Sequence, residues 1–210
     1  MRLGIYGGVF NPPHLGHLVA AQEAHAQLEL DAVVWIPAGR PPHRVIDQDP
    51  GAEARCEMVE LTVAGDERFR VSRMEIEREG PSYTVDTLRE LKESGPDDEL
   101  FLVLGGDQAA ALSTWHQPEE VLALATIAVF ERATDNRNAI AIRLSRIRGA
   151  DRLRFLSMPR IDISSTLVRR RAAEGKPIRY LVPDKVANFI GAQSLYGSST
   201  PAATEAAAKA

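Results

Sequence analysis

The stretch LGIYGGVFNPPHLGH, residues 3–17, begins with the character of a buried strand and ends at the start of a helix. The apolar run Leu3–Tyr6 stops at two glycines, which predicts a strand closed by a tight turn. Prolines then stiffen a short loop, and Leu15–Gln27 has the composition of a helix. A buried strand, a loop and a helix in this order are typical of the first unit of a parallel α/β sheet.

Short apolar stretches alternate with amphipathic ones along most of the remaining chain. Strands that alternate with helices pair in parallel and are covered on both faces. We therefore expect a Rossmann-like, doubly wound α/β fold with a mainly parallel sheet. The further strands expected are Ala32–Pro37, Phe69–Ile76, Glu99–Leu104, Thr126–Phe130 and Leu153–Met158. The further helices expected are Ala52–Ala64, Ser82–Glu93 with a Ser or Thr cap, Pro118–Ala125, Asn138–Ile147, Ser165–Glu174 and Pro183–Ile190.

The expected elements also divide the chain. We expect residues 1–163 to form the α/β core and residues 164–196 to form a small C-terminal helical subdomain. Residues 197–210 lack large apolar side chains. Such a segment cannot bury enough apolar surface to order itself, so we expect a disordered tail.

Composition and charge exclude several classes of protein. The 210-residue chain is 44% hydrophobic and 26% charged, which excludes a fibrous or wholly disordered protein. A formal net charge of −4 argues against polymeric nucleic acid or a membrane surface as a partner. Residues 132–180 nevertheless hold 12 Arg and one Lys against four acids, a local +9. A basic segment in an acidic protein suggests a site for a small anion.

The single cysteine and the apolar runs indicate the cellular setting. Cys56 cannot form an internal disulfide, and its place in an amphipathic helix favours a buried structural thiol. The longest apolar run, Val121–Phe130, has about half the length that a bilayer requires. The chain passes from Arg2 directly into strand residues without a signal peptide. We expect a cytoplasmic protein without a membrane partner.

The first of three polar clusters follows the first strand, at the end where open parallel sheets bind ligands. Gly7 and Gly8 let the backbone pass close to a ligand, and the next helix offers free N–H groups to phosphate. His14 and His17 are three residues apart, so both rings can face one ligand. The plainer interpretation is a tight turn with His14 as a helix cap. A metal site is disfavoured, because the H-E-x-x-H pattern and an acidic cluster are both lacking.

The second and third clusters lie after later strands. In ISSTLVR, residues 163–169, Ser165 is a good helix cap and Arg169 lies one turn further on the same face. Hydroxyls, helix N–H groups and a guanidinium would then converge on phosphate oxygens; an ordinary capped helix with a surface arginine is the alternative. In the third cluster, Gly105–Asp107 with Trp115 further on, Asp107 can bind ribose hydroxyls or help to hold a cation, and Trp115 can stack on a ring. Its alternative is a helix cap and a core tryptophan.

Two of these clusters carry long motifs. GVFNPPHLGH resembles the G-x-F-D/N-P-x-H-x-G-H signature of the H-x-G-H nucleotidyltransferases, and ISSTLVR resembles their I-S-S-T-x-x-R signature. Along most of residues 2–195 the chain resembles the bacterial nicotinate-nucleotide adenylyltransferases. The segments that carry this closer resemblance are PAGRPPHR (37–44), GPSYTVDTL (80–88), VLGGDQAAALSTW (103–115) and YLVPDKVANF (180–189).

This resemblance implies transfer of AMP from ATP to nicotinate mononucleotide, with Mg²⁺ bound alongside ATP and a role in NAD biosynthesis. Three side chains would act on the reacting phosphates: His14, His17 and Arg169. The implied ATP-binding residues are Gly7, Gly8, Phe10, His14, His17, His43, Arg44, Ser164, Ser165 and Arg169. The implied substrate-binding residues are Thr84, Gly106, Asp107, Trp115 and Arg132. No protein residue is assigned to a metal, and a homo-oligomer is compatible with the sequence.

Three residues depart from the family pattern. Asn11 stands where Asp is commoner, Val9 where Thr or Ser is usual, and Arg44 where Lys is more familiar. Asn keeps an acceptor but loses a charge, which weakens any metal site at this position, whereas Arg44 keeps its charge. The other hypotheses are a transferase for phosphopantetheine or nicotinamide substrates, a non-catalytic nucleotide-binding regulator and a metal-dependent hydrolase.

Overall fold

The computed structural model describes the whole chain except residues 43–44, 131–136, 146, 148, 150–151 and 199–210. One six-stranded sheet runs through it in the order β3-β2-β1-β4-β5-β6, and every neighbouring pair is parallel. The strands are β1 (Arg2–Gly8), β2 (Ala32–Pro37), β3 (Phe69–Val71), β4 (Glu99–Gly105), β5 (Thr126–Phe130) and β6 (Leu153–Leu156). The expected doubly wound α/β fold is confirmed.

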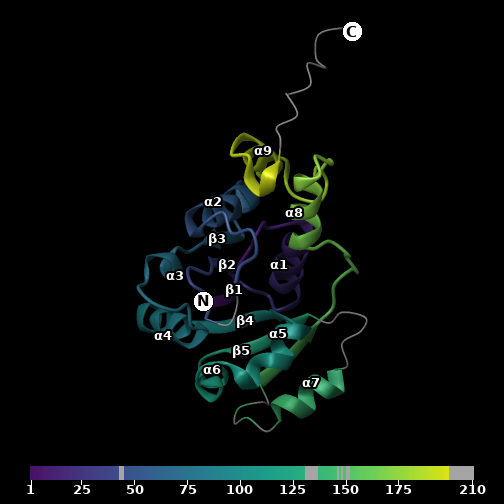
Figure 1. Cartoon of the computed structure of the whole chain (residues 1–210). Helices are drawn as coiled ribbons and strands as arrows, with labels where there is room; N and C mark the ends of the chain where they lie inside the picture. Colours follow the sequence, from purple (N-terminus) through teal and green to yellow (C-terminus); the bar gives the residue numbers. More distant parts are fainter. Residues whose placement is uncertain (43–44, 131–136, 146, 148, 150–151, 199–210) are drawn as a thin grey trace.

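Helices cover both faces of the sheet (Figure 1). Side chains of successive strand residues point to opposite faces. Val33 and Trp35 of β2 accordingly pack with α1 (Leu15–Gln27) and α2 (Ala52–Val63). Val34 and Ile36 belong to the core of the other face. The helices that contribute to that core are α4 (Thr84–Ser94), α5 (Gly106–Ala111), α6 (Pro118–Leu124) and α7 (Arg137–Leu144).

The C-terminal elements pack as a group on α2. They are α8 (Ser165–Ala173), α9 (Asp184–Ala192) and the 3₁₀ helix η3 (Leu195–Gly197); in Figure 1, α9 lies next to α2 and α8 lies on the other side of α9. Val168, Val186 and Ile190 form a small buried cluster there with Met58 of α2. Ser198, which belongs to the expected tail, packs against this group, and its hydroxyl donates to the carbonyl of Ile190 at 3.2 Å. Residues 199–210 of the expected tail lie outside the described part.

The strand expected over Phe69–Ile76 is wrong in its second half. The chain leaves the sheet after β3, where the N–H of Ser72 donates to Trp35 at 2.9 Å. Met74–Glu77 then form a short helix, α3, in which Glu75 is buried. Met74 and Ile76 fit the period of two that favours a strand, but in the helical turn they are only half-buried and Glu75 takes the buried position.

Two expected helix caps also differ. Tyr83, not a Ser or Thr, precedes α4, and its side chain makes no capping bond. The N-cap of α8 is Ser164, one residue before the expected Ser165. Two short helices after β4, α5 and the 3₁₀ helix η1 (Leu112–Thr114), were not expected, because Gly105–Asp107 has the composition of a loop. The other helix bounds agree within three residues, and the largest difference is at α7, which ends at Leu144 rather than at Ile147; one or two residues is the ordinary uncertainty of helix ends.

The strand connections diverge beside β1, and we use the word crevice for the place beyond the carboxyl ends of β1 and β4 where a ligand is expected. β1 pairs with β2 on one side and with β4 on the other. The segment after β1 therefore leads to one face of the sheet, through α1, and the segment after β4 leads to the other, through α5. Ligands of open α/β sheets bind where neighbouring connections diverge in this way. Two of the three polar clusters predicted from the sequence lie at this point.

Candidate active site

We call the loop from Gly7 to His17, with the side chains that hold it, the β1 half of the crevice. Gly7 and Gly8 are the last residues of β1 and lie opposite Ile36 and Pro37 of β2. Phe10 adopts a left-handed φ of 50° and is only 4% exposed. Its ring centroid lies 5.3 Å from that of His17. A backbone held in a sparsely populated region at such a loop is typical of a functional site.

His14 and His17 form one stacked unit at the start of α1. Their ring centroids are 3.7 Å apart. The N–H of His14 donates to Nδ1 of His17 at 3.0 Å, so the proton of a neutral His17 ring lies on Nε2. A Cβ on Gly16 would approach the His14 ring to 3.0 Å, so this position favours glycine. The H-x-G-H motif thus presents a donor at Nε2 of His17.

Arg169 reaches from α8 back to this loop. Its side chain is buried, with 8% of the residue exposed. Nη1 donates to the carbonyl oxygen of Asn11 at 2.8 Å, and Nη2 lies 3.2 Å from the carboxylate of Asp47. Among the described residues Nε, also buried, has no hydrogen-bond partner. The guanidinium is therefore anchored at one corner and paired at another with a carboxylate that is 79% exposed.

The two serines of ISSTLVR have different tasks. Ser164 caps α8, because its Oγ accepts from the N–H of Leu167 at 3.2 Å. Ser165 donates from Oγ to the carbonyl of Pro12 at 2.9 Å. Ser165 and Arg169 therefore join two motifs that lie some 150 residues apart, 153 in the first case and 158 in the second.

Arg55 of α2 also belongs to the β1 half, and the sequence analysis missed it. Its side chain has no exposure. Nη1 donates to the carbonyls of Val9 at 3.0 Å and Ala38 at 2.6 Å, while Nε bonds to Asp49 at 3.0 Å. One buried guanidinium thus connects the loop after β1 to the loop after β2. Its signal in the sequence was a charged residue on the apolar stripe of a helix, with Val59 one turn further on the same stripe.

The residues after β4, together with the start of α4, form the β4 half of the crevice. Gly106 is buried at the first turn of α5, and Asp107 is exposed beside it. Trp115 follows η1 and packs partly against the core. Thr84 is half-buried at the first position of α4.

Ser82, which precedes α4, connects the β4 half to the loop after β2. Its Oγ accepts from the N–H groups of Gly39 at 3.1 Å and Arg40 at 3.0 Å. Ser82 therefore holds the loop after β2 and does not cap α4.

The chain is similar to known proteins over most of its length. Residues 5–171 match the model of the family described as cytidylyltransferase-like. A Thermus thermophilus protein named "Probable nicotinate-nucleotide adenylyltransferase" is 43% identical over 93% of this chain and all of its own length. A Shouchella clausii protein of the same name is 39% identical, over 94% of this chain and 98% of its own. The chain belongs to the nicotinate-nucleotide adenylyltransferase family.

A solved structure shows the same fold at much lower identity. It is the Plasmodium falciparum nicotinic acid mononucleotide adenylyltransferase complexed with NaAD. It is 16% identical and superposes with a TM-score of 0.75, covering 94% of this chain and 98% of that one. The α/β architecture of this nicotinate-nucleotide adenylyltransferase family member is therefore shared with a distant protein.

Three predicted site residues, His43, Arg44 and Arg132, lie outside the described residues of this adenylyltransferase. The other predicted residues fall into the two halves. In the β1 half, the ring of Phe10 contacts the ring of His17, and Arg169 donates to the carbonyl of Asn11 in the loop. Thr84, Gly106, Asp107 and Trp115 lie in the β4 half.

Glu75 is a buried carboxyl group that the sequence analysis did not single out. It accepts from the hydroxyl of Thr87 at 2.8 Å and is 8% exposed. Burial raises the pKa of Glu75 above its ordinary value, and the bond from Thr87 and the charge of Arg78 oppose the shift.

Burial also raises the pKa of the Cys56 thiol, to about 11, and the charge of Glu60 adds to this shift. The structural interpretation of Cys56 agrees with this shift, because a protonated thiol is unreactive.

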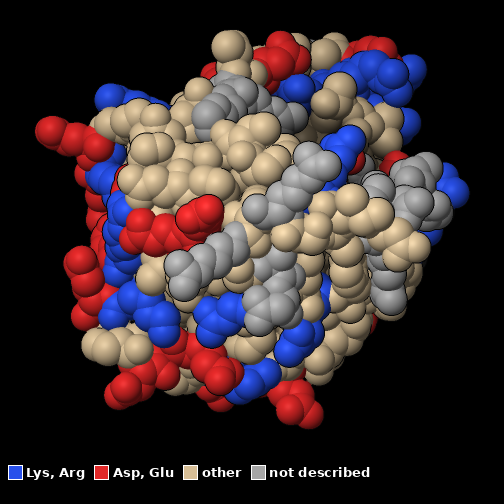
Figure 2. All heavy atoms as spheres, turned by 90° about the horizontal axis from the view of Figure 1, so that it is seen from below, with Lys and Arg blue, Asp and Glu red and all other residues tan. Residues whose placement is uncertain are grey.

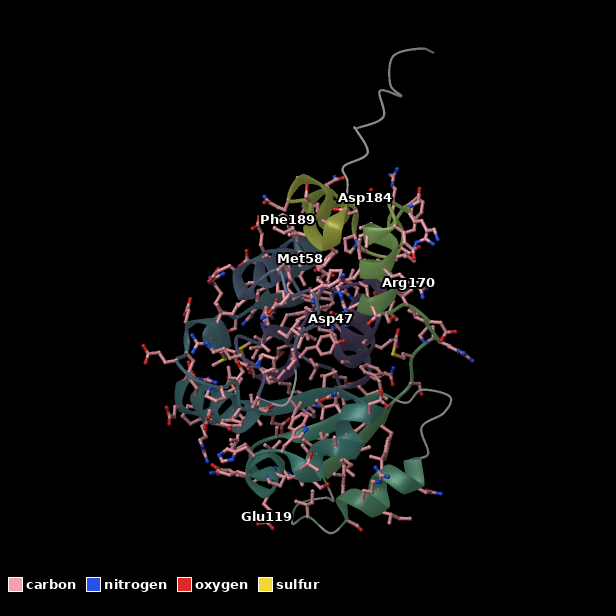
Figure 3. All side chains as sticks on the ribbon, in the orientation of Figure 1. Asp47, Met58, Glu119, Arg170, Asp184 and Phe189 are labelled. Atoms are coloured by element: carbon pink, nitrogen blue, oxygen red, sulfur yellow. The ribbon has the colours of Figure 1, made fainter. Side chains whose placement is uncertain are left out.

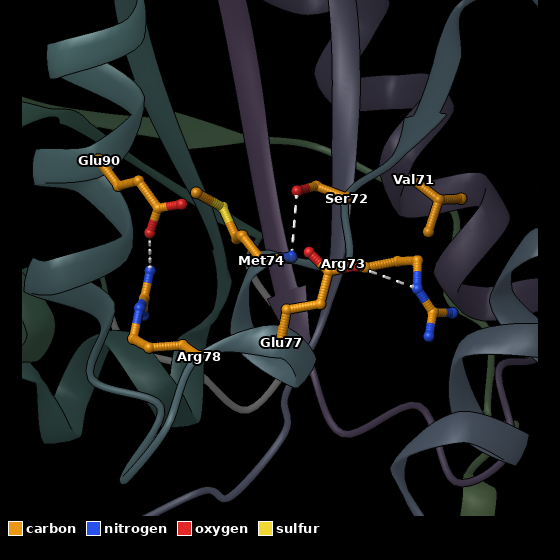
Figure 4. A pocket seen from close by; sticks show the side chains of 7 residues that line it. All are labelled: Val71, Ser72, Arg73, Met74, Glu77, Arg78 and Glu90. Carbon is orange, nitrogen blue, oxygen red and sulfur yellow. Dashed lines mark hydrogen bonds and ion pairs between the residues drawn. The ribbon is translucent and has the colours of Figure 1, made fainter.

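Two of the surface hollows in the described part of the chain bear on the position of the site. One, of about 600 Å³, lies beside β3 and α3, and Figure 4 shows Arg78 paired with Glu90 and Arg73 close to Glu77. Its charged groups largely neutralise one another, and none of the predicted site residues lines it. The other, of about 690 Å³, lies between α5 and α7 and includes Asp107.

Acidic and basic side chains alternate along the rim of the face in Figure 2, whose middle is occupied mostly by other residues. No group of three His, Cys, Asp or Glu side chains that could hold a metal occurs among the described residues. Within the same residues no helix is long and apolar enough to cross a bilayer.

Proposed function

We propose that this chain transfers the adenylyl group of ATP to nicotinate mononucleotide, forming nicotinate adenine dinucleotide and pyrophosphate in NAD biosynthesis. The observation that carries the proposal is the joining of the H-x-G-H loop to Arg169 at the crevice beside β1. The names of the relatives and the NaAD complex of the Plasmodium protein support the choice of substrates.

The reaction needs alignment of two anions more than it needs a protein nucleophile. A phosphate oxygen of nicotinate mononucleotide attacks the α-phosphorus of ATP and forms the new P–O bond. The bond from the α-phosphorus to the bridging oxygen breaks, and pyrophosphate leaves with that electron pair. Positioning of reactants contributes about 7–11 kcal/mol to such a step, and fixed donors aimed at the developing charge add to it.

We assign the phosphate contacts to the β1 half. His17 would donate from Nε2 to a phosphate oxygen, because Nδ1 is held by the N–H of His14. Arg169 would bind the β- and γ-phosphates, with Ser164 and Ser165 at the N-terminus of α8 beside it. His14 would act with His17 on the triphosphate and the transition state, while Gly7, Gly8 and Phe10 would line the nucleotide floor. His43 and Arg44 keep the assignment that the family resemblance implies.

Mg²⁺ would enter with ATP. The described residues offer no ready cage for it, which fits the habit of Mg²⁺ to bind substrate phosphates and water with few protein ligands. When bound, Mg²⁺ neutralises part of the triphosphate charge. The side chains of the β1 half would neutralise the rest of the triphosphate charge and keep the phosphates in position.

We assign recognition of the mononucleotide to the β4 half. Thr84 and Trp115 would face the nicotinate ring, with Gly106 and Asp107 near the bound nucleotide; Arg132 is assigned there by the family resemblance alone. We also infer that the chain acts in the cytoplasm on small molecules, without polymeric nucleic acid or a membrane, and that a homo-oligomer is compatible with this role.

The test is pyrophosphate release from ATP and Mg²⁺ with a panel of acceptors. Nicotinate mononucleotide, nicotinamide mononucleotide and phosphopantetheine are compared under identical conditions. We expect the highest kcat/KM with nicotinate mononucleotide and a dinucleotide product in equal amount to pyrophosphate. Equal efficiency with the nicotinamide substrate would overturn the carboxylate preference. Release with none of the acceptors would overturn the function itself.

A further inference from the structure

Tyr196 is the last aromatic residue of the described chain, yet it reaches the first signature motif. Its hydroxyl donates to Oδ1 of Asn11 at 2.7 Å, a buried bond between residues 185 positions apart. The backbone of Tyr196 is in the left-handed region, with φ of 59°, and Ser194 is similar at 50°. Two such residues in one short turn indicate that packing and this bond hold η3 in place.

Asn11 connects three parts of the β1 half. Its Nδ2 donates to the carbonyl of Asp47 at 2.9 Å, which leaves Oδ1 to accept from Tyr196. Its own carbonyl accepts from Nη1 of Arg169 at 2.8 Å. The residue is 4% exposed. Both polar atoms of the buried Asn11 side chain are hydrogen-bonded, and this fixes the orientation of the residue. The backbone carbonyl of Asn11 is therefore a fixed acceptor for the guanidinium of Arg169.

The ring of Tyr196 is fixed as firmly as its hydroxyl. It belongs to the buried cluster of the C-terminal elements, with Val168 of α8 and Met58 of α2; Figure 3 labels Met58 beneath α9. Burial raises the pKa of the Tyr196 hydroxyl, although the charges of Arg169 and Arg55 oppose the shift. The group therefore stays a neutral donor at physiological pH.

We propose that Tyr196 is a positioning residue for the phosphate site, because its hydroxyl holds Asn11 and Asn11 holds the guanidinium of Arg169. The proposal rests on the proposed function for its kinetic readout, but ATP binding tests it separately. It gives the C-terminal turn a role in ATP binding that neither signature motif reveals.

The test is Tyr196→Phe, which keeps the ring and removes one hydroxyl. The control is Tyr180→Phe, since Tyr180 is 74% exposed and also has a positive φ, 68°. We expect Tyr196→Phe to raise KM for ATP three- to tenfold while KM for nicotinate mononucleotide stays within twofold. The control should leave both within twofold. Equal rises in the two KM values, or a lowered Tm without a change in KM for ATP, would overturn the proposal.

A double variant separates positioning from general loosening. If Tyr196 acts through Arg169, adding Tyr196→Phe to Arg169→Ala should lower kcat/KM by less than twofold further. Full addition of the two effects would contradict the proposal.

The Kd for ATP, measured calorimetrically, gives a readout without the second substrate. It should rise three- to tenfold in Tyr196→Phe, and an unchanged value would count against the proposal. If wild type binds ATP but releases no pyrophosphate with any acceptor, the proposed function fails, while this Kd comparison still decides the role of Tyr196.

Discussion

The two halves of the crevice are built in different ways. In the β1 half, buried polar side chains from distant parts of the chain hold a backbone loop: Arg55 and Arg169 donate to its carbonyls. In the β4 half, Trp115 packs on the apolar core and Asp107 is exposed. A loop held by buried hydrogen bonds keeps a fixed geometry, because breaking one bond leaves an unsatisfied buried group. An exposed side chain such as that of Asp107 can instead adapt its conformation to a ligand.

This difference matches the two parts of the proposed reaction. The chemical step needs phosphates placed within a fraction of an ångström, and preorganised donors supply that at no cost during the reaction. Recognition of a ring tolerates more movement. We therefore expect changes in the β1 half to lower the rate of transfer, and changes in the β4 half to alter the affinity for the mononucleotide.

The largest effect is expected from Arg169→Ala. Loss of one preorganised donor to developing charge typically costs about 2.7–4 kcal/mol, so kcat/KM should fall by roughly 10² to 10³. The measurement is pyrophosphate release at saturating nicotinate mononucleotide. The control is Arg170→Ala, since Arg170 is exposed on the outer side of α8 (Figure 3). An Arg169 variant that folds and keeps turnover within threefold of wild type would remove this residue from the phosphate site.

Arg55→Met tests the support of the β1 loop. Methionine fills much of the volume but leaves the carbonyls of Val9 and Ala38 without their buried donor. We expect the free energy of unfolding, measured with urea, to fall by about 2–3 kcal/mol. Arg73→Met is the matched control, because Arg73 is 38% exposed and pairs with Glu53 at the surface; exposed pairs contribute about 0–1 kcal/mol. If both variants lose the same free energy of unfolding, the buried hydrogen bonds of Arg55 stabilise the protein no more than the surface ion pair of Arg73 does.

Trp115→Ala addresses the β4 half. If the indole stacks on the nicotinate ring, KM for nicotinate mononucleotide should rise about tenfold, the equivalent of about 1.4 kcal/mol. KM for ATP should stay within twofold, and Trp115→Phe should recover most of the loss. An equal rise in the two KM values would erase the proposed division between the halves.

Asp47→Asn should lower the KM for ATP. The exposed Asp47 carboxylate pairs with Nη2 of Arg169 in the described structure, a place that phosphate oxygens would take. A half-exposed pair contributes about 0–1 kcal/mol, so KM for ATP should fall by about two- to fivefold. Asp162→Asn, which alters an exposed pair with Arg160, is the control. A rise in KM for ATP would show that Asp47 orients Arg169 rather than competing for it.

The smallest effect concerns Glu75 and pH. Its raised pKa means that the folded protein binds this proton more tightly than the unfolded chain. The contribution of Glu75 to stability is therefore fully present below its unfolded pKa and is lost as pH rises through the folded pKa. Glu75→Gln removes this loss, so the Tm of the variant relative to wild type should be higher at pH 7.5 than at pH 4. Glu77→Gln, at a glutamate 69% exposed, should show no such trend.

Local sequence patterns predicted most of the fold. They could not predict hydrogen bonds between residues that are far apart in the sequence. The apolar runs of β2 and β4 and the two signature motifs are each contained within a few residues, so their meaning was readable. The strand predicted over Phe69–Ile76 was wrong in its second half, because the alternating pattern did not reveal a helical turn that buries the charged Glu75. Arg55 and Tyr196 act on residues 46 and 185 positions away. No sequence period connects such pairs, although Arg55 stood out as a charge on a buried stripe.

The central claim is that the chain aligns two anions for direct displacement at the α-phosphorus. The most direct test is a rapid-quench experiment with ATP labelled at the α-phosphate, with and without nicotinate mononucleotide. We predict no labelled protein and no pyrophosphate burst without the acceptor, and dinucleotide and pyrophosphate appearing together when it is added. Labelled protein, or pyrophosphate released before the acceptor is present, would contradict direct transfer.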